Sequence, residues 1–172
     1  MNNRRNFSAD QLREIVEYNP DTGVFRWLPR SSPPAFNANY AGKEAGSIFL
    51  NESGRKYKVI QIYGQRYGAH RLAYIYMTGK WPNEYIDHVD GDSLNNVWSN
   101  LRPANAAQNS ANAKRYRSNT SGLKGVSYAA RHGKWRAAYG RVWLGNFATK
   151  EEAHEAYMTK ARELHGDFAR AE

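Results

Sequence analysis

One segment near the middle of the chain is dense in Asp, Asn and His, a composition that seldom serves packing. In it, Asp87 and His88 are adjacent and follow two strand-forming residues, Tyr85 and Ile86. A carboxylate is a hard oxygen ligand for Mg²⁺, and an imidazole with an ordinary pKa of about 6.5 can accept a proton near neutrality. The pair predicts phosphodiester hydrolysis, which needs a base to deprotonate water and a cation to neutralise the charge developing on the phosphate.

The residues directly after this pair favour a chain reversal. Asp90-Gly91-Asp92 suits a turn, because Asp and Gly tolerate turn geometry and an Asp side chain can bond to nearby backbone. A calcium-binding loop is the alternative, but such a loop needs a Glu at its twelfth position, which this segment lacks. Asp90 and Asp92 are therefore interpreted as turn formers, and Asn95 and Asn96 are expected to tie the loop to its own backbone.

In order and spacing, the segment resembles the HNH nuclease motif in the form used by phage and intron-encoded homing endonucleases. The resemblance covers about 30 residues and rests on DHVDG at 87–91, NN at 95–96, NLR at 100–102 and a further Asn at 109. It implies a ββα-metal motif over residues 85–113, with a hairpin from 85 to about 104 and a helix from about 105 to 114.

The resemblance also implies roles for four residues. Asp87 and Asn109 would bind the metal, His88 would activate water, and Asn100 would hold the imidazole in position. Because Asn109 stands where many members of the superfamily have a third His, the implied cofactor is one Mg²⁺ or Mn²⁺ ion per active site and not Zn²⁺.

Three further residues near the motif are assigned by their type and place. Arg102 is expected either to contact a phosphate near the cut or to form a structural ion pair. Arg71 is expected to contact a phosphate, and its neighbour His70 is expected to be structural.

The elements around the motif predict an α+β protein whose N-terminal region is rich in antiparallel strands. Ser8 and Gln11 form a capping-box pattern, so a helix is expected through Leu12, Ile15 and Val16, up to the turn at 19–23. The remaining predictions are strands at 24–27, 46–50, 56–63 and 66–69, a loop at 31–42 and a helix at 70–77.

The C-terminal part predicts a three-stranded antiparallel sheet packed on one helix. Short strands are expected at 125–128, 135–139 and 142–147, and Thr149 with Glu152 marks the start of a helix with one apolar stripe.

Residues 121–168 resemble the ethylene-response-factor (APETALA-type) DNA-binding domain in GVSY, GKW, WLGNF and the Ala-rich helix, although the turn at 139–142 is several residues shorter than usual. The resemblance implies that one sheet face packs on the helix and the other enters the major groove. Alternation then predicts a core of Val126, Tyr128, Trp135, Ala137, Tyr139, Val142 and Leu144. It predicts a DNA-contacting face of Ser127, Arg131, Arg136, Arg141 and Trp143.

Between the two regions lies a polar, basic stretch at 114–121. It is interpreted as a linker, and its Lys114, Arg115 and Arg117 either contact backbone phosphates or lie on a solvated loop. The domains expected are thus an HNH endonuclease domain at 1–113 and an APETALA-type domain at 122–172.

Charge points to an anionic partner. The 172 residues include 25 Lys plus Arg against 16 Asp plus Glu, a formal net charge of +9. Residues 93–172 hold 13 basic and 6 acidic side chains, whereas residues 1–92 hold 12 and 10. Most phosphate contacts are therefore expected in the C-terminal half.

Other function classes are excluded by what the sequence lacks. With no Cys, the chain has no disulfides, thiolate zinc sites or cysteine nucleophiles. No apolar run is long enough for a signal peptide or a membrane span, so the protein is expected to be intracellular, in the cytoplasm of a bacterial host if phage-encoded.

The leading functional hypothesis is a metal-dependent, homing-type phage endonuclease that acts on double-stranded DNA. One HNH motif per chain favours nicking of one strand by a monomer or weak dimer. The alternatives are a non-catalytic DNA-binding or regulatory protein with a degenerate HNH scaffold, and an RNA-binding module, for which no motif is visible.

Overall fold

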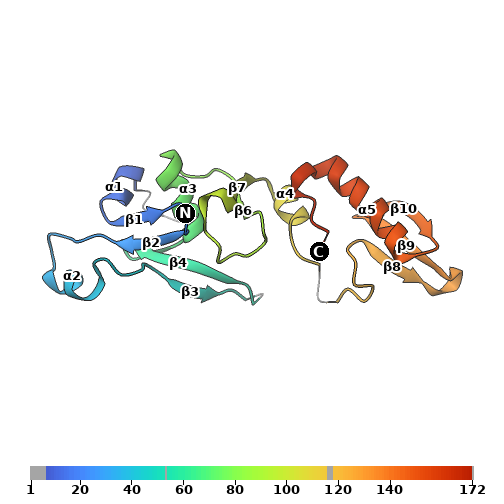
Figure 1. Ribbon diagram of the computed structural model, residues 1–172, viewed down its shortest axis with the longest axis horizontal. Coiled ribbons are helices and arrows are strands. Elements are labelled where there is room, and N and C mark those ends of the chain that lie inside the picture. The colour runs from blue at the N-terminus through green and yellow to red at the C-terminus, as the bar shows by residue number, and fades with distance from the viewer. Residues whose placement is uncertain (1–6, 53, 116–117, 172) are drawn as a thin grey trace. The chain divides into compact units, whose positions relative to one another are not determined.

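The structure, a computed structural model, describes residues 7–52, 54–115 and 118–171. The chain forms two compact units, Met1–Pro103 and Ala104–Glu172, and each combines helices with antiparallel strands (Figure 1). The predicted α+β class is therefore confirmed. Across the described ranges, no helix has both the length and the apolarity needed to cross a bilayer.

In its described residues, the N-terminal unit contains three small sheets and three α-helices. The helices are α1 (Ala9–Arg13), α2 (Pro34–Tyr40) and α3 (Ala69–Thr78). The strands pair as β1 (Val16–Asn19) with β2 (Val24–Trp27), as β3 (Ser47–Leu50), β4 (Lys56–Ile62) and β5 (Gln65–Gly68) in that order, and as β6 (Tyr85–His88) with β7 (Leu101–Ala104).

One hydrophobic core joins most of these elements, with α2 and β3 outside its buried residues. Ile60 and Ile62 alternate along β4 and are almost fully buried against Leu72 of α3. Burying each such side chain stabilises the fold by roughly 1.5–3 kcal/mol. Ile86 of β6 and Leu101 of β7 belong to the same core, so the hairpin that carries the Asp- and His-rich segment is fixed by packing from beneath.

The first helix is shorter than expected. The predicted capping box is confirmed, with the Ser8 side chain accepting from the backbone N–H of Gln11 and the Gln11 side chain from that of Ser8. The helix ends at Arg13, however, and Val16 begins strand β1, so the prediction that Ile15 and Val16 are helical was wrong. Val16 and Tyr18 are buried at alternate positions of β1, a pattern that sheet pairing with β2 satisfies.

The segment expected as a loop at 31–42 contains a helix, α2. Pro34 occupies its first turn, where the missing N–H costs nothing. Phe36 packs edge-on against Trp27, with ring centroids 5.7 Å apart, and the guanidinium of Arg30 lies 3.8 Å from the Phe36 ring centroid. These contacts outweigh the Pro- and Asn-rich composition that predicted a loop.

The C-terminal unit has the predicted three-stranded sheet with a helix across it. Its strands β8 (Val126–Ala129), β9 (Lys134–Tyr139) and β10 (Val142–Phe147) pair antiparallel in the order β10-β9-β8. Helix α5 (Lys150–His165) contacts all three strands and begins with the predicted capping box of Thr149 and Glu152. Val126, Ala137 and Ala153 form the buried centre of this unit.

Two residues predicted for this core are exposed. Tyr128 has 56% of its surface accessible and Val142 has 50%. Val142 pairs with Tyr139 beside the tight hairpin turn. Alternation along a strand assigns a face, but burial also requires the helix to cover that part of the face, and the pattern carries no information on the helix's reach.

Helix α4 (Ala106–Ala111) packs within the C-terminal unit, where it contacts α5 and the 3₁₀ turn Gly166–Phe168. It begins with a capping box of Asn105 and Gln108 and ends three residues before the predicted limit. Beyond its end, the Lys124 ammonium donates to the backbone carbonyls of Ala111, Ala113 and Arg170 at 2.8–2.9 Å. Packing thus divides the chain at Pro103, and the domain limits expected at 113 and 122 stay a prediction.

Candidate active site

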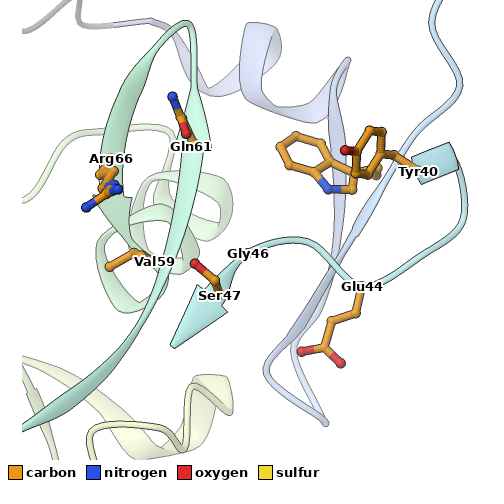
Figure 2. A pocket seen from close by; sticks show the side chains of 8 residues that line it. Tyr40, Glu44, Gly46, Ser47, Val59, Gln61 and Arg66 are labelled. Carbon is orange, nitrogen blue, oxygen red and sulfur yellow. The ribbon is translucent and has the colours of Figure 1, made fainter. Parts of the chain in front are cut away.

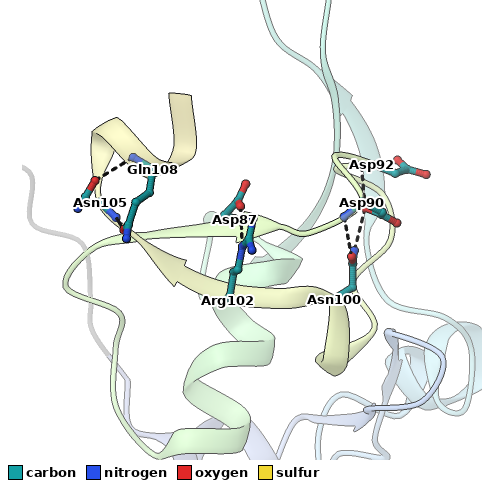
Figure 3. A network of polar contacts seen from close by, with 7 residues as sticks. All are labelled: Asp87, Asp90, Asp92, Asn100, Arg102, Asn105 and Gln108. Atoms are coloured by element: carbon teal, nitrogen blue, oxygen red, sulfur yellow. Dashed lines mark hydrogen bonds and ion pairs between the residues drawn. The ribbon is translucent and has the colours of Figure 1, made fainter. Parts of the chain in front are cut away.

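The loop between β6 and β7 is held by its own polar side chains (Figure 3). The Asp90 carboxylate accepts from the backbone N–H of Asp92 at 2.8 Å, and the Asp92 carboxylate accepts from that of Leu94 at 3.0 Å. The Asn95 amide donates to the other Asp90 oxygen at 2.7 Å. These bonds confirm Asp90 and Asp92 as turn formers and lower the pKa of Asp90 in spite of the opposing effect of its burial.

The Asn100 side chain bonds to the chain just after His88, and its role in holding the imidazole in position stays a prediction. Its Oδ1 accepts from the backbone N–H of Asp90, and its Nδ2 donates to Asp90 Oδ1, each at 3.0 Å. Its backbone carbonyl accepts from the N–H of Val89 at 2.9 Å. Since Asn100 directly precedes β7, opposite the first residues of the loop, its side chain meets the backbone after His88. Asn100 therefore fixes the chain that carries the histidine.

The Asn96 side chain faces the His88 ring. Its Oδ1 lies 3.4 Å from His88 Nε2, and its Nδ2 donates to the carbonyl of Leu94 at 3.0 Å. With Nδ2 so engaged, Oδ1 is the atom turned to the ring, which favours the tautomer with the proton on Nε2 and the lone pair on Nδ1. Both residues are buried, and burial lowers the pKa of His88 against the opposing effects of Asn96 and the nearby carboxylates.

Asn96 is itself held by the β1–β2 hairpin. The buried Tyr18 hydroxyl donates to the Asn96 carbonyl at 2.7 Å, and burial raises the pKa of Tyr18. Gly23 approaches so closely that a Cβ there would lie 2.4 Å from the Asn96 carbonyl carbon. Gly23 also has a φ of +71°, which only glycine adopts freely. The expectation that Asn96 ties the loop is confirmed, but its contact with His88 depends on this distant hairpin and carried no sequence signal.

His70 lies next to His88. The His70 and His88 ring centroids are 5.3 Å apart in an edge-to-face arrangement, and the Tyr57 ring is 6.1 Å from His70 on another side. Burial, together with His88 and Arg71, lowers the pKa of His70 to about 3. His70 is thus a neutral packing partner at neutral pH, in line with its predicted structural role.

Asp87 is paired with Arg102 across the β6–β7 hairpin (Figure 3). Arg102 Nε lies 3.0 Å from Asp87 Oδ2, and only 7% of the carboxylate side chain and 19% of the arginine side chain are exposed. Of the two roles predicted for Arg102, the structure shows the ion pair.

The two predicted metal ligands lie in different units. Asp87 is on β6 in the N-terminal unit, and Asn109 is on α4 in the C-terminal unit. In the part of the chain that the structure describes, no three His, Cys, Asp or Glu side chains gather into a metal cluster. Mg²⁺ suits such a sparse donor set, because it commonly takes one or two protein oxygens and completes its shell with water and substrate phosphates. Joint ligation by Asp87 and Asn109 stays a prediction.

An open hollow of about 270 Å³ in the N-terminal unit contains none of the predicted site residues. Tyr40 stands on one side of it, and Gln61 and Arg66 stand on the other (Figure 2). The predicted catalytic residues instead lie on the β6–β7 hairpin and its loop.

Comparisons with known proteins match the same segment of the chain. A protein family described as HNH endonuclease matches residues 67–111, which include the whole β6–β7 hairpin. Protein 3.8 of Escherichia phage T7 is 46% identical over 92 residues, which are 50% of this chain and 74% of the phage protein. This chain belongs to the HNH endonuclease family.

A second relative of this chain has a lower sequence identity. The uncharacterized HNH endonuclease L560 of Acanthamoeba polyphaga mimivirus is 39% identical over 106 residues, which are 58% of this chain but only 54% of the viral protein. No solved structure matches the chain. The family match and this relative support nuclease function.

Arg71 of the HNH endonuclease has structural partners. Its guanidinium donates to the carbonyls of Pro82 and Glu84 at 3.1 and 3.2 Å, which ties α3 to the segment entering β6. These bonds give Arg71 a structural role that does not involve DNA. A phosphate contact by Arg71 stays a prediction.

The predicted DNA-contacting face of the C-terminal sheet is open to solvent in every member. Ser127, Arg136 and Trp143 lie on strands, as alternation predicted, whereas Arg131 lies in the 3₁₀ turn Ala130–His132 and Arg141 in the turn between β9 and β10. Arg136 lies on the central strand with Ser127 and Asn146 as its cross-strand neighbours, and 61% of Trp143 is accessible. Of the predicted linker contacts, Lys114 and Arg115 are exposed, and Arg117 lies outside the described residues.

Proposed function

We propose that this HNH endonuclease hydrolyses phosphodiester bonds in double-stranded DNA with one divalent metal ion, as a homing-type phage nuclease. The observation that supports the proposal best is that Asp87 and His88, consecutive on β6, are both buried in a segment that matches the family. A carboxylate ligand beside a neutral imidazole is the minimum that metal-assisted hydrolysis of a phosphodiester needs.

His88 serves as the base. Burial lowers its pKa, so the ring is neutral and able to take a proton at neutral pH. With Nε2 directed at Asn96 Oδ1, Nδ1 carries the lone pair that removes the proton from the attacking water. Asn100 keeps the ring in place through the backbone, because it bonds the two residues that follow His88.

Asp87 and Asn109 would hold the cofactor, Mg²⁺ or Mn²⁺. When bound, the ion would offset the negative charge that builds up on the phosphate as the water attacks. Asp87 is preoriented for this task, because Arg102 and the two paired strands fix its carboxylate.

The C-terminal sheet supplies DNA affinity as an APETALA-type module. Arg136 and Trp143 stand exposed on its strands, Arg131 and Arg141 stand exposed in the turns that join them, and this half of the chain holds most of the excess positive charge. Arginine suits guanine edges and phosphates, and an exposed indole can pack on sugar or a thymine methyl group. With one HNH motif per chain, a monomer would leave a nick in one strand.

The direct test is cleavage of supercoiled plasmid by purified protein with Mg²⁺. We expect conversion to the open-circular form, its loss on addition of EDTA, and its loss in His88→Ala. A control variant, His132→Ala, removes an exposed histidine of the C-terminal unit and should cut like the wild type. If wild type and His88→Ala behave alike, the chain is not a nuclease, and a non-catalytic DNA-binding role takes its place.

A further inference from the structure

The predicted metal ligand Asp87 already has a cationic partner, Arg102. The guanidinium Nε is 3.0 Å from the carboxylate, and both side chains are largely shielded from water. Charges in such surroundings are costly to leave unpaired, so the carboxylate needs a counterion whether or not a metal is present.

A divalent cation approaching Asp87 would meet the fixed positive charge of Arg102. Like charges repel more strongly where water is scarce, so the guanidinium weakens the affinity of the carboxylate for any cation. A DNA phosphate brings negative charge to the same place, and a guanidinium binds phosphate oxygens as readily as it binds a carboxylate.

We propose that Arg102 is the resident counterion of the Asp87 carboxylate and transfers to a DNA phosphate when the divalent cation binds. The inference rests on the proposed function, because it takes Asp87 as a metal ligand. It adds to the proposed function a residue that contacts the substrate. It also implies that the cation and DNA bind cooperatively, each raising the affinity of the protein for the other by the same factor. The free enzyme then holds little metal.

Mn²⁺ provides the test, because unbound Mn²⁺ is counted directly by electron paramagnetic resonance. Removing the charge in Arg102→Gln should raise the affinity of the DNA-free protein for Mn²⁺ by roughly tenfold or more. Arg102→Lys keeps the charge and should stay within a few-fold of the wild type. Arg66→Gln removes an exposed arginine of the same unit that none of the proposed steps uses, and should change nothing.

The second measurement adds DNA. In a His88→Ala background, where we expect no cutting, a short duplex should tighten Mn²⁺ binding to the otherwise unaltered protein. The gain should be much smaller when Arg102→Gln is added. Thermal melting followed by circular dichroism checks that each variant is folded, and Arg102→Lys gives a readout even if the glutamine variant proves unstable.

The outcomes separate this inference from the proposed function. If Arg102→Gln binds Mn²⁺ as the wild type does, or more weakly, Arg102 merely orients Asp87 and the counterion role is overturned. If Arg102→Lys raises the affinity for Mn²⁺ as much as Arg102→Gln does, the positive charge of residue 102 does not control that affinity. The counterion role is then also overturned. If Asp87→Asn leaves Mn²⁺ binding intact, Asp87 is no ligand, and the proposed metal site fails together with the inference.

Discussion

The two regions expected to act on DNA differ in how they hold their polar side chains. In the β6–β7 hairpin, the side chains of Asp87, His88 and Asn96 are buried and bonded to neighbours from other strands and loops. On the C-terminal sheet, Arg136 and Trp143 stand exposed on their strands. The contrast indicates that the first region is built for geometry and the second for charge and contact area.

This contrast has a physical basis. A base and a metal ligand must keep their positions to a fraction of an ångström. Hydrogen bonds from buried neighbours hold them there, although burying polar groups lowers stability unless each group is paired. A surface that binds the phosphate backbone of DNA gains affinity from accessible positive charge, which neutralises phosphates without needing such exact placement. Substitutions in the two regions should therefore affect different measured quantities.

The sharpest separation comes from His88→Ala. We expect kcat for plasmid nicking to fall by about 10²–10⁴-fold, the usual worth of a general base. The Kd for a duplex, measured by fluorescence anisotropy, should stay within twofold, because the ring is buried and adds no charge to the surface. A comparable loss of affinity would show that His88 serves DNA binding.

Asn96→Ala tests the support that the structure adds to the motif. Loss of the Oδ1 contact frees the His88 ring, and kcat should fall by roughly 10–100-fold, as is usual when a partner of a catalytic group is removed. Asn100→Ala should instead act mainly through loosening of the loop and a lower melting temperature. If Asn100→Ala lowers kcat more than Asn96→Ala at unchanged stability, the assignment of the ring contact to Asn96 is wrong.

Arg136→Ala measures the other region. If the arginine reads a base, the Kd should rise by the equivalent of about 1–3 kcal/mol, and kcat at saturating DNA should not change. If it contacts only phosphate, the salt dependence of binding should weaken by about one ion. Arg162→Ala, which alters an exposed arginine of helix α5 bonded to Glu155, is the matched control.

The smallest expected effect concerns stability and pH. The pKa of His70 falls from 6.5 to about 3 on folding. Below pH 6.5, His70 therefore binds a proton in the unfolded chain but stays neutral in the folded chain. Its contribution to the free energy of unfolding is present above pH 6.5 and should fall by about 2 kcal/mol on acidification to pH 5. Urea titrations at both pH values should show a weaker pH dependence for His70→Gln. An unaltered dependence would place the ring in contact with water.

The sequence predicted what depends on local pattern. Adjacent Asp87 and His88 on a strand, the Asp90 turn and the capping boxes of α1 and α5 each follow from neighbouring residues, and all are found. The three-stranded sheet with its helix was likewise readable from alternation and helical spacing.

What the sequence could not give depends on contacts between distant segments. Tyr18 and Asn96 are 78 residues apart, and no spacing rule links them. Helix α2 depends on Phe36 packing on Trp27, and the exposure of Tyr128 depends on how far α5 reaches. The metal-binding roles of Asp87 and Asn109 and the DNA-contacting face remain predictions.

The three bonds from the Lys124 ammonium to backbone carbonyls bear on how this enzyme can be dissected. A fragment ending at residue 113 would retain the whole family-matching segment, yet it would lose the cation that satisfies the carbonyls of Ala111 and Ala113. The segment that matches the family, residues 67–111, is therefore shorter than the segment needed for a stable fold. Minimal versions of the nuclease should be cut after α5 rather than before β8.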